Sequence, residues 1–180
     1  GIEYEGSSYH GWQSQPGLPS IQDHLQAALS AVAAHPVQVN AAGRTDAGVH
    51  ATGQVIHFDT TAGRDAWSWV RGGNSHLPAN IRILWAEPVP DEFHARFAAI
   101  ARSYDYWLLN DPVSPGVLQG RVGWFHAPLE VAAMQQAVDR LLGEHDFSTF
   151  RSAECQAKTP VKNLQQAVLS RHGPFIRFHF

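Results

Sequence analysis

The residues best suited to chemistry lie in one short run, Gly43-Arg44-Thr45-Asp46-Ala47-Gly48-Val49-His50-Ala51. An arginine and an acid stand two residues apart between glycines that let the backbone turn or approach a ligand closely. A carboxylate at such a bend can act as a base or as a nucleophile. The simpler alternative makes Asp46 a turn acid that pairs with Arg44.

Predicted secondary structure places this run on a loop. Alternating apolar residues on either side predict half-buried strands near residues 37–42 and 53–59, and loops between strands often carry function. Residues 1–5 suit a strand. Ser20 suits an N-cap, and apolar residues then fall on one helical face until Pro36 ends the helix.

The rest of the chain interleaves strands and helices, which predicts an α+β protein of two related lobes. A strand over Ser103–Leu109 would place Tyr104 and Tyr106 on one face. The other predicted elements are a short helix around Trp67–Val70, a strand over Ile81–Glu87, a helix from Met134 that Gly143 closes, and strands near 164–171 and 174–180.

Composition bounds the class of protein. The chain of 180 residues is 44% hydrophobic and 16% charged, with no apolar run of membrane-spanning length and no signal-peptide pattern. A single cysteine, Cys155, excludes an internal disulfide and suits a reducing cytoplasm. The net charge of −3 disfavours nucleic acid, but residues 147–180 hold five Lys and Arg against one Glu. That segment either faces RNA or is a solvated basic surface.

Five strings give the chain a family likeness. In chain order they are IEYEGSSYHGWQSQ, GRTDAGVHATGQVIHF, FHARFAAIARSYDYWLLN, LLGEHDFSTF and RHGPFIRFHF. The chain resembles the TruA family of tRNA pseudouridine synthases from residue 1 to residue 180. The resemblance implies an α+β fold of two ferredoxin-like or RRM-like lobes, at 1–92 and 93–180. Their strands would merge into one mixed, mainly antiparallel sheet with helices on one side.

The resemblance also implies a function. Such enzymes convert uridine to pseudouridine at positions 38 to 40 in the anticodon arm of tRNA, as cytoplasmic homodimers without cofactor or metal. The reaction breaks the bond from N1 to C1′, turns the uracil and rejoins it through C5. Asp46 matches the catalytic aspartate, which acts as a nucleophile at C1′ or as a base at C2′.

Two further residues match the family's site. Arg44 stands where the family has an arginine for binding and base flipping, since an enzyme must extrude a stacked uridine to reach it. Its alternative role is to fix the Asp46 side chain. Tyr104 matches the tyrosine that lies against the target base. Without the resemblance it would be taken for a core tyrosine, and Tyr106 is interpreted as structural.

Other chemistries find little support. Of the eleven histidines, His50, His57 and His94 lie near the motifs, but their spacing does not match a metal site, and we expect His50 and His57 to bond loop backbone. No serine-hydrolase elbow or glycine-rich nucleotide loop is present. The main alternative is a catalytically incomplete RNA-binding fragment, and a nucleoside hydrolase comes third.

The sequence also departs from the family's pattern at both ends. It begins inside what resembles the family's first strand. It ends at Phe180, before the segment in which relatives carry a further helix with an arginine that pairs with the catalytic aspartate. We therefore expect the C-terminal lobe to be incomplete relative to the family.

Overall fold

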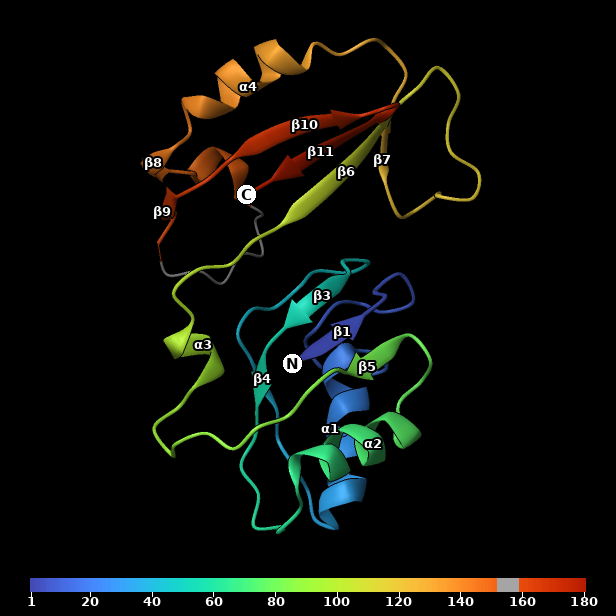
Figure 1. Ribbon diagram of the computed structural model, residues 1–180, viewed down its shortest axis with the longest axis vertical. Helices are drawn as coiled ribbons and strands as arrows, with labels where there is room; N and C mark the ends of the chain where they lie inside the picture. Colours follow the sequence, from blue (N-terminus) through green and yellow to red (C-terminus); the bar gives the residue numbers. More distant parts are fainter. Residues whose placement is uncertain (152–158) are drawn as a thin grey trace. The chain divides into compact units, whose positions relative to one another are not determined.

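The computed structural model describes residues 1–151 and 159–180, so Cys155 and Lys158 lie outside the described residues. The chain divides into two compact units, Gly1–Arg102 and Ser103–Phe180, each with its own sheets and helices (Figure 1). This confirms the α+β class. The four hydrogen-bonded sheets each lie within one unit. The merging of the two lobes into one sheet stays a prediction.

The first unit is built on a three-stranded antiparallel sheet in the order β3-β1-β5. Its strands are β1 (Ile2–Tyr4), β3 (Ala51–Gln54) and β5 (Ile81–Ile83), and its main helices are α1 (Ile21–Ala33) and α2 (Ala66–His76). Along β1, Ile2 and Tyr4 are buried while Glu3 is exposed. The buried face packs into the same core as Leu25 and Leu29 of α1, so the helices cover one face of this sheet.

The first helix begins and ends for local reasons. The Ser20 side chain accepts a hydrogen bond from the Asp23 backbone N–H, which is the N-cap predicted from the sequence. Ala34 adopts a left-handed conformation with φ of 59°, so the helix ends at Ala33, three residues before Pro36.

The chain changes strand partners after the loop, which corrects one prediction. The single strand expected near 53–59 is broken at Val55, because β3 pairs with β1 whereas β4 (Ile56–His57) pairs with β2 (Asn40–Ala41). The expected strand near 37–42 is reduced to β2. The strand expected over Ile81–Glu87 ends at Ile83, because only these three residues pair with β1.

Residues 93–102 belong to the first compact unit. The division into lobes at 1–92 and 93–180 stays a prediction. The short helix α3 (Ala95–Ala98) is attached by its first residue, whose backbone N–H donates to His57 Nδ1 at 3.1 Å. At the end of this stretch the Arg102 guanidinium donates to the Ala42 carbonyl oxygen.

The second unit is a mixed sheet in the order β10-β11-β6-β7, in which only β6 and β7 run parallel. The helix α4 contacts β10, and β8 pairs with β9 in a separate two-stranded sheet. Gly143 begins β8 rather than closing the helix. The bounds are β6 (Asp105–Asn110), β7 (Gly123–Phe125), α4 (Val131–Asp139), β8 (Gly143–Asp146), a 3-10 helix (Ser148–Phe150), β9 (Val161–Leu164), β10 (Val168–His172) and β11 (Phe175–His179).

Candidate functional site

The loop between β2 and β3, residues 42–50, carries the run singled out in the sequence, and we call it the signature loop. Arg44 and Asp46 are exposed, while Thr45 between them is half-buried. The Thr45 hydroxyl lies 2.8 Å from the hydroxyl of the buried Tyr4. The loop is therefore anchored through its uncharged residue and presents its two charged side chains to solvent.

Asp46 is the first residue of a tight turn. The Val49 backbone N–H donates to the Asp46 carbonyl at 3.2 Å, and Gly48 at the third position has φ of +79°, which favours glycine. This turn sets the backbone direction at Asp46, and a pairing of its side chain with Arg44 stays a prediction.

Residues 6–12 pack against the signature loop and hold its backbone. The Trp12 N–H donates to the Thr45 carbonyl at 2.9 Å, and the Gly48 N–H donates to the Tyr9 carbonyl at 3.3 Å. Gly11 has φ of +89°, and a Cβ there would lie 2.7 Å from the Thr45 carbonyl oxygen. Only glycine allows the two backbones to approach this closely.

A second close approach lies at the end of the loop. The Gly6 N–H donates to His50 Nδ1 at 3.1 Å, and a Cβ on Gly6 would collide with the Val49 carbonyl. The imidazole also lies 3.4 Å from the Glu5 carboxylate. These contacts confirm that His50 bonds loop backbone. They also explain the string IEYEGSSYHGWQSQ, whose glycines fit against the loop; the sequence showed these glycines without indicating what they contact.

The start of the loop is held by two side chains that sequence reasoning missed. The Gln54 side-chain amide pairs with both polar backbone atoms of Gly43, donating to its carbonyl at 2.6 Å and accepting from its N–H at 3.3 Å. The Arg102 guanidinium donates from Nε to the Ala42 carbonyl at 3.0 Å. Both residues lie within the family-like strings, Gln54 in the string that carries the loop and Arg102 in a later one. Because Arg102 is distant in sequence, no local signal connects it to the loop.

Two histidines attach the α3 segment to the small β2–β4 sheet. The His57 and His94 rings lie 4.4 Å apart between centroids, and Phe97 lies 4.2 Å beyond His94. Burial and the neighbouring His94 lower the pKa of His57 below its ordinary value, which favours the neutral acceptor form. Across residues 1–151 and 159–180, no three metal-ligating side chains are grouped as a metal site.

In the second unit, Tyr104 directly precedes β6. Its backbone N–H and C=O both bond Phe180, each at 2.9 Å, and its side chain is 51% exposed. This exposure argues against a core tyrosine. Tyr106 instead packs edge-on against Phe178, with ring centroids 5.8 Å apart, and its hydroxyl lies over Gly123. Tyr106 is equally exposed, at 52%, so exposure alone does not distinguish the two tyrosines.

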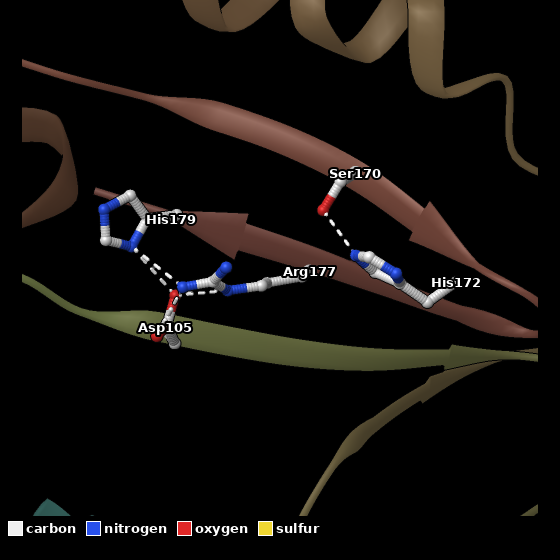
Figure 2. Close-up of polar contacts among 5 residues, drawn as sticks. All are labelled: Asp105, Ser170, His172, Arg177 and His179. Atoms are coloured by element: carbon white, nitrogen blue, oxygen red, sulfur yellow. Dashed lines mark hydrogen bonds and ion pairs between the residues drawn. The ribbon is translucent and has the colours of Figure 1, made fainter. Parts of the chain in front are cut away.

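An ion-pair cluster fixes the strand that follows Tyr104 (Figure 2). Arg177 makes a two-pronged contact with Asp105, from Nε to Oδ1 at 2.7 Å and from Nη2 to Oδ2 at 3.0 Å, and His179 Nδ1 lies 2.9 Å from Oδ1. The Arg177 hydrogen bonds hold the pKa of Asp105 below its usual range. From the sequence, Arg177 was one of the basic residues of 147–180 that either face RNA or form a solvated surface. In the structure its guanidinium joins β11 to β6 through Asp105.

Comparison with known proteins gives the family. The family model for tRNA pseudouridine synthase matches residues 2–98 and 137–180, which include the signature loop and β11, while Tyr104 lies between the two matched ranges. The chain belongs to the tRNA pseudouridine synthase family. It is 57% identical to the tRNA pseudouridine synthase A of Methylobacillus flagellatus and 59% identical to that of Dechloromonas aromatica, in each case over 180 residues that span the whole chain and 69% of the relative.

Family membership confirms the resemblance and the prediction of a tRNA-modifying enzyme. A third tRNA pseudouridine synthase A, from Paraburkholderia phytofirmans, is 55% identical over the full chain, which covers 67% of that relative. The strings that carried the resemblance therefore lie inside a likeness that extends over all 180 residues. Within the part of the chain that the structure describes, the helices are too short or too polar to cross a membrane.

Proposed function

We propose that the signature loop delivers the catalytic carboxylate for the conversion of uridine to pseudouridine, and that this carboxylate belongs to Asp46. The observation that supports this assignment is an exposed acid on a turn whose backbone is fixed by Gly11, Trp12 and Gly48. A carboxylate held in place beside a sugar needs little reorganisation when the glycosidic bond breaks. Asp46 acts on the ribose, at C1′ as a nucleophile or at C2′ as a base.

Arg44 and Tyr104 hold the extruded nucleotide in this proposal. Arg44 is exposed on the same loop, two residues before Asp46, where a guanidinium can bond phosphate or base as the uridine leaves its stack. Tyr104 offers a half-exposed ring whose backbone is fixed to Phe180, and an aromatic plane suits an unstacked base.

The proposed substrate is narrower than the one that family membership shows, which is tRNA. We assign the anticodon arm of tRNA, at positions 38 to 40, as the target, and a cytoplasmic homodimer as the working form, without cofactor or metal. The support is the resemblance of the signature strings and the high identity to tRNA pseudouridine synthase A proteins. Mapping pseudouridine in treated tRNA tests the position, and light scattering of the full chain tests the dimer.

The decisive experiment compares Asp46→Asn with the wild-type protein on tRNA tritiated at C5 of uridine, because the C5 hydrogen leaves when the new bond forms. We expect binding to survive and turnover to fall by roughly four orders of magnitude. Turnover by the Asn variant within about tenfold of wild type would remove Asp46 from the chemistry. A wild-type protein that binds tRNA without turnover would favour the RNA-binding alternative, and released uracil would favour the hydrolase.

Tyr104 is tested by two substitutions that separate the ring from the hydroxyl. Tyr104→Phe keeps the platform, and Tyr104→Leu removes it. A proton-transfer role requires Phe to block turnover while RNA still binds. If Phe behaves like wild type and Leu does not, the tyrosine acts through stacking alone.

A further inference from the structure

The backbone conformation of Gly43 does not explain why this position is glycine. Gly48, at the other end of the signature loop, has a positive φ of +79°, whereas Gly43 is not among the described glycines with positive φ. A Cβ on Gly43 would instead lie 3.1 Å from Nε and 3.3 Å from Cδ of Arg102. The missing side chain at position 43 makes room for the Arg102 guanidinium against the loop.

Arg102 is fixed in this place by one edge of its guanidinium. Both Nε and Nη2 donate to the Ala42 carbonyl, so the planar group is held as a fork at the first residue of the signature loop. The side chain is exposed, and its remaining N–H bonds have no hydrogen-bond partner among the described residues. One edge therefore binds the loop, and the opposite edge faces away from that carbonyl.

Other arginines of the chain are arranged differently. Arg177 donates from Nε and Nη2 to the Asp105 carboxylate, which neutralises the charge of the guanidinium. Arg171 donates from Nη2 to Asn110 and to the Leu129 carbonyl within the second unit. Arg102 bonds a neutral carbonyl, so its full positive charge stays beside the loop that carries Asp46.

We propose that Arg102 is a substrate-binding residue, which contacts a phosphodiester of the RNA next to the target uridine with its outer edge. The proposal rests on the assignment of the signature loop as the catalytic loop. A guanidinium suits this task because it is always charged and its paired donors match two phosphate oxygens. Since the fork to Ala42 already restrains the side chain, little conformational entropy is lost when the phosphate binds.

The test measures how tRNA binding depends on salt, because each neutralised phosphate adds a slope of about 0.7–0.9 to the plot of log affinity against log salt. Arg102→Met should lower that slope by about 0.7–0.9, so that the loss of affinity between about 50 and 200 mM salt becomes roughly threefold smaller. Arg102→Lys keeps the charge and should keep the slope. Arg64→Met is the matched control, since Arg64 is an exposed arginine that donates to the Val32 carbonyl.

The slope separates binding from a purely structural role. A misfolded fraction changes the apparent affinity at every salt concentration alike and leaves the slope unchanged. If Arg102→Met and Arg102→Lys both weaken binding with the wild-type slope, Arg102 only supports the loop and the proposal is wrong. A slope that falls equally in Arg64→Met also overturns it. Failure of the proposed function would be seen separately, as an Asp46→Asn variant that retains turnover.

Discussion

Replacing Gly11 with alanine tests whether the close approach of residues 6–12 positions the signature loop, in which we propose Asp46 as the catalytic residue. At φ of +89° an alanine costs about 1–2 kcal/mol of backbone strain. The new Cβ would also lie 2.7 Å from the Thr45 carbonyl oxygen and 3.1 Å from the Asp46 carbonyl carbon. Both atoms are backbone and cannot rotate away, so the loop itself must shift. Displacing a catalytic group by about 1 Å can cost 100-fold in rate.

Gly17 supplies the matched control for this substitution. It has a similar φ of +75°, but no atom lies within 4 Å of the position its Cβ would take. Gly17→Ala therefore carries the strain without the collision. We expect both variants to lose about 1–2 kcal/mol of stability, and only Gly11→Ala to lose about tenfold or more in kcat for pseudouridine formation.

The assay combines thermal melts with tritium release from C5-labelled tRNA at saturating substrate. The comparison isolates the loop shift because the two variants share the backbone penalty. Equal kcat values for Gly11→Ala and Gly17→Ala, in protein that is folded at the assay temperature, would refute the argument that this contact sets the position of Asp46. A loss confined to KM would also refute it, since a displaced carboxylate slows the chemical step.

Three further predictions follow from hydrogen-bonded groups. Gln54→Glu places a carboxylate against the Gly43 carbonyl and should lower kcat at least about tenfold with a loss of about 1–3 kcal/mol in melts. Asp105→Asn should lower the free energy of unfolding by only about 0.5–1 kcal/mol at pH 7, because the ion pair with Arg177 is more than a third exposed. Since the pKa of Asp105 is lowered in the folded protein, this difference from wild type is present above about pH 4 and disappears as pH falls through the lowered pKa. Urea titrations at several pH values measure it. The lowered pKa of His57 should make the wild type less stable as pH falls below about 6.5, and His57→Asn should flatten the dependence of melting temperature on pH in this range.

Elements with a local cause could be predicted from the sequence. The first helix was placed correctly because its cap and its apolar face lie in consecutive residues around Ser20. The strand after the loop was predicted too long because its break depends on partners: residues on either side of Val55 pair with strands that begin near residue 2 and residue 40. Apolar alternation shows that a segment is extended, but not which strand it joins.

The candidate site likewise contains residues that the sequence could reveal and residues that only the fold reveals. Asp46, Arg44 and Tyr104 were selected from short strings, because the residues expected to perform chemistry are polar and exposed, and such residues stand out in a sequence. The residues that position the loop do not stand out. Gly43 and Gly48 look alike in the sequence, yet one adopts a positive φ and the other makes room for Arg102. Only the folded chain distinguishes these two reasons for a glycine.

The positions of these supporting residues explain how the loop can be rigid and still exposed. Its start is held by Gln54 and Arg102, and its centre and end by residues 6–12, so these restraints act on the loop backbone and leave the side chains of Arg44 and Asp46 exposed. Substitutions among the supports should therefore change kcat and leave tRNA affinity nearly intact, since they move Asp46 without removing a contact to RNA. Arg102 is the exception that our proposal requires, because it both restrains the loop and binds phosphate, and its loss should change affinity and rate together.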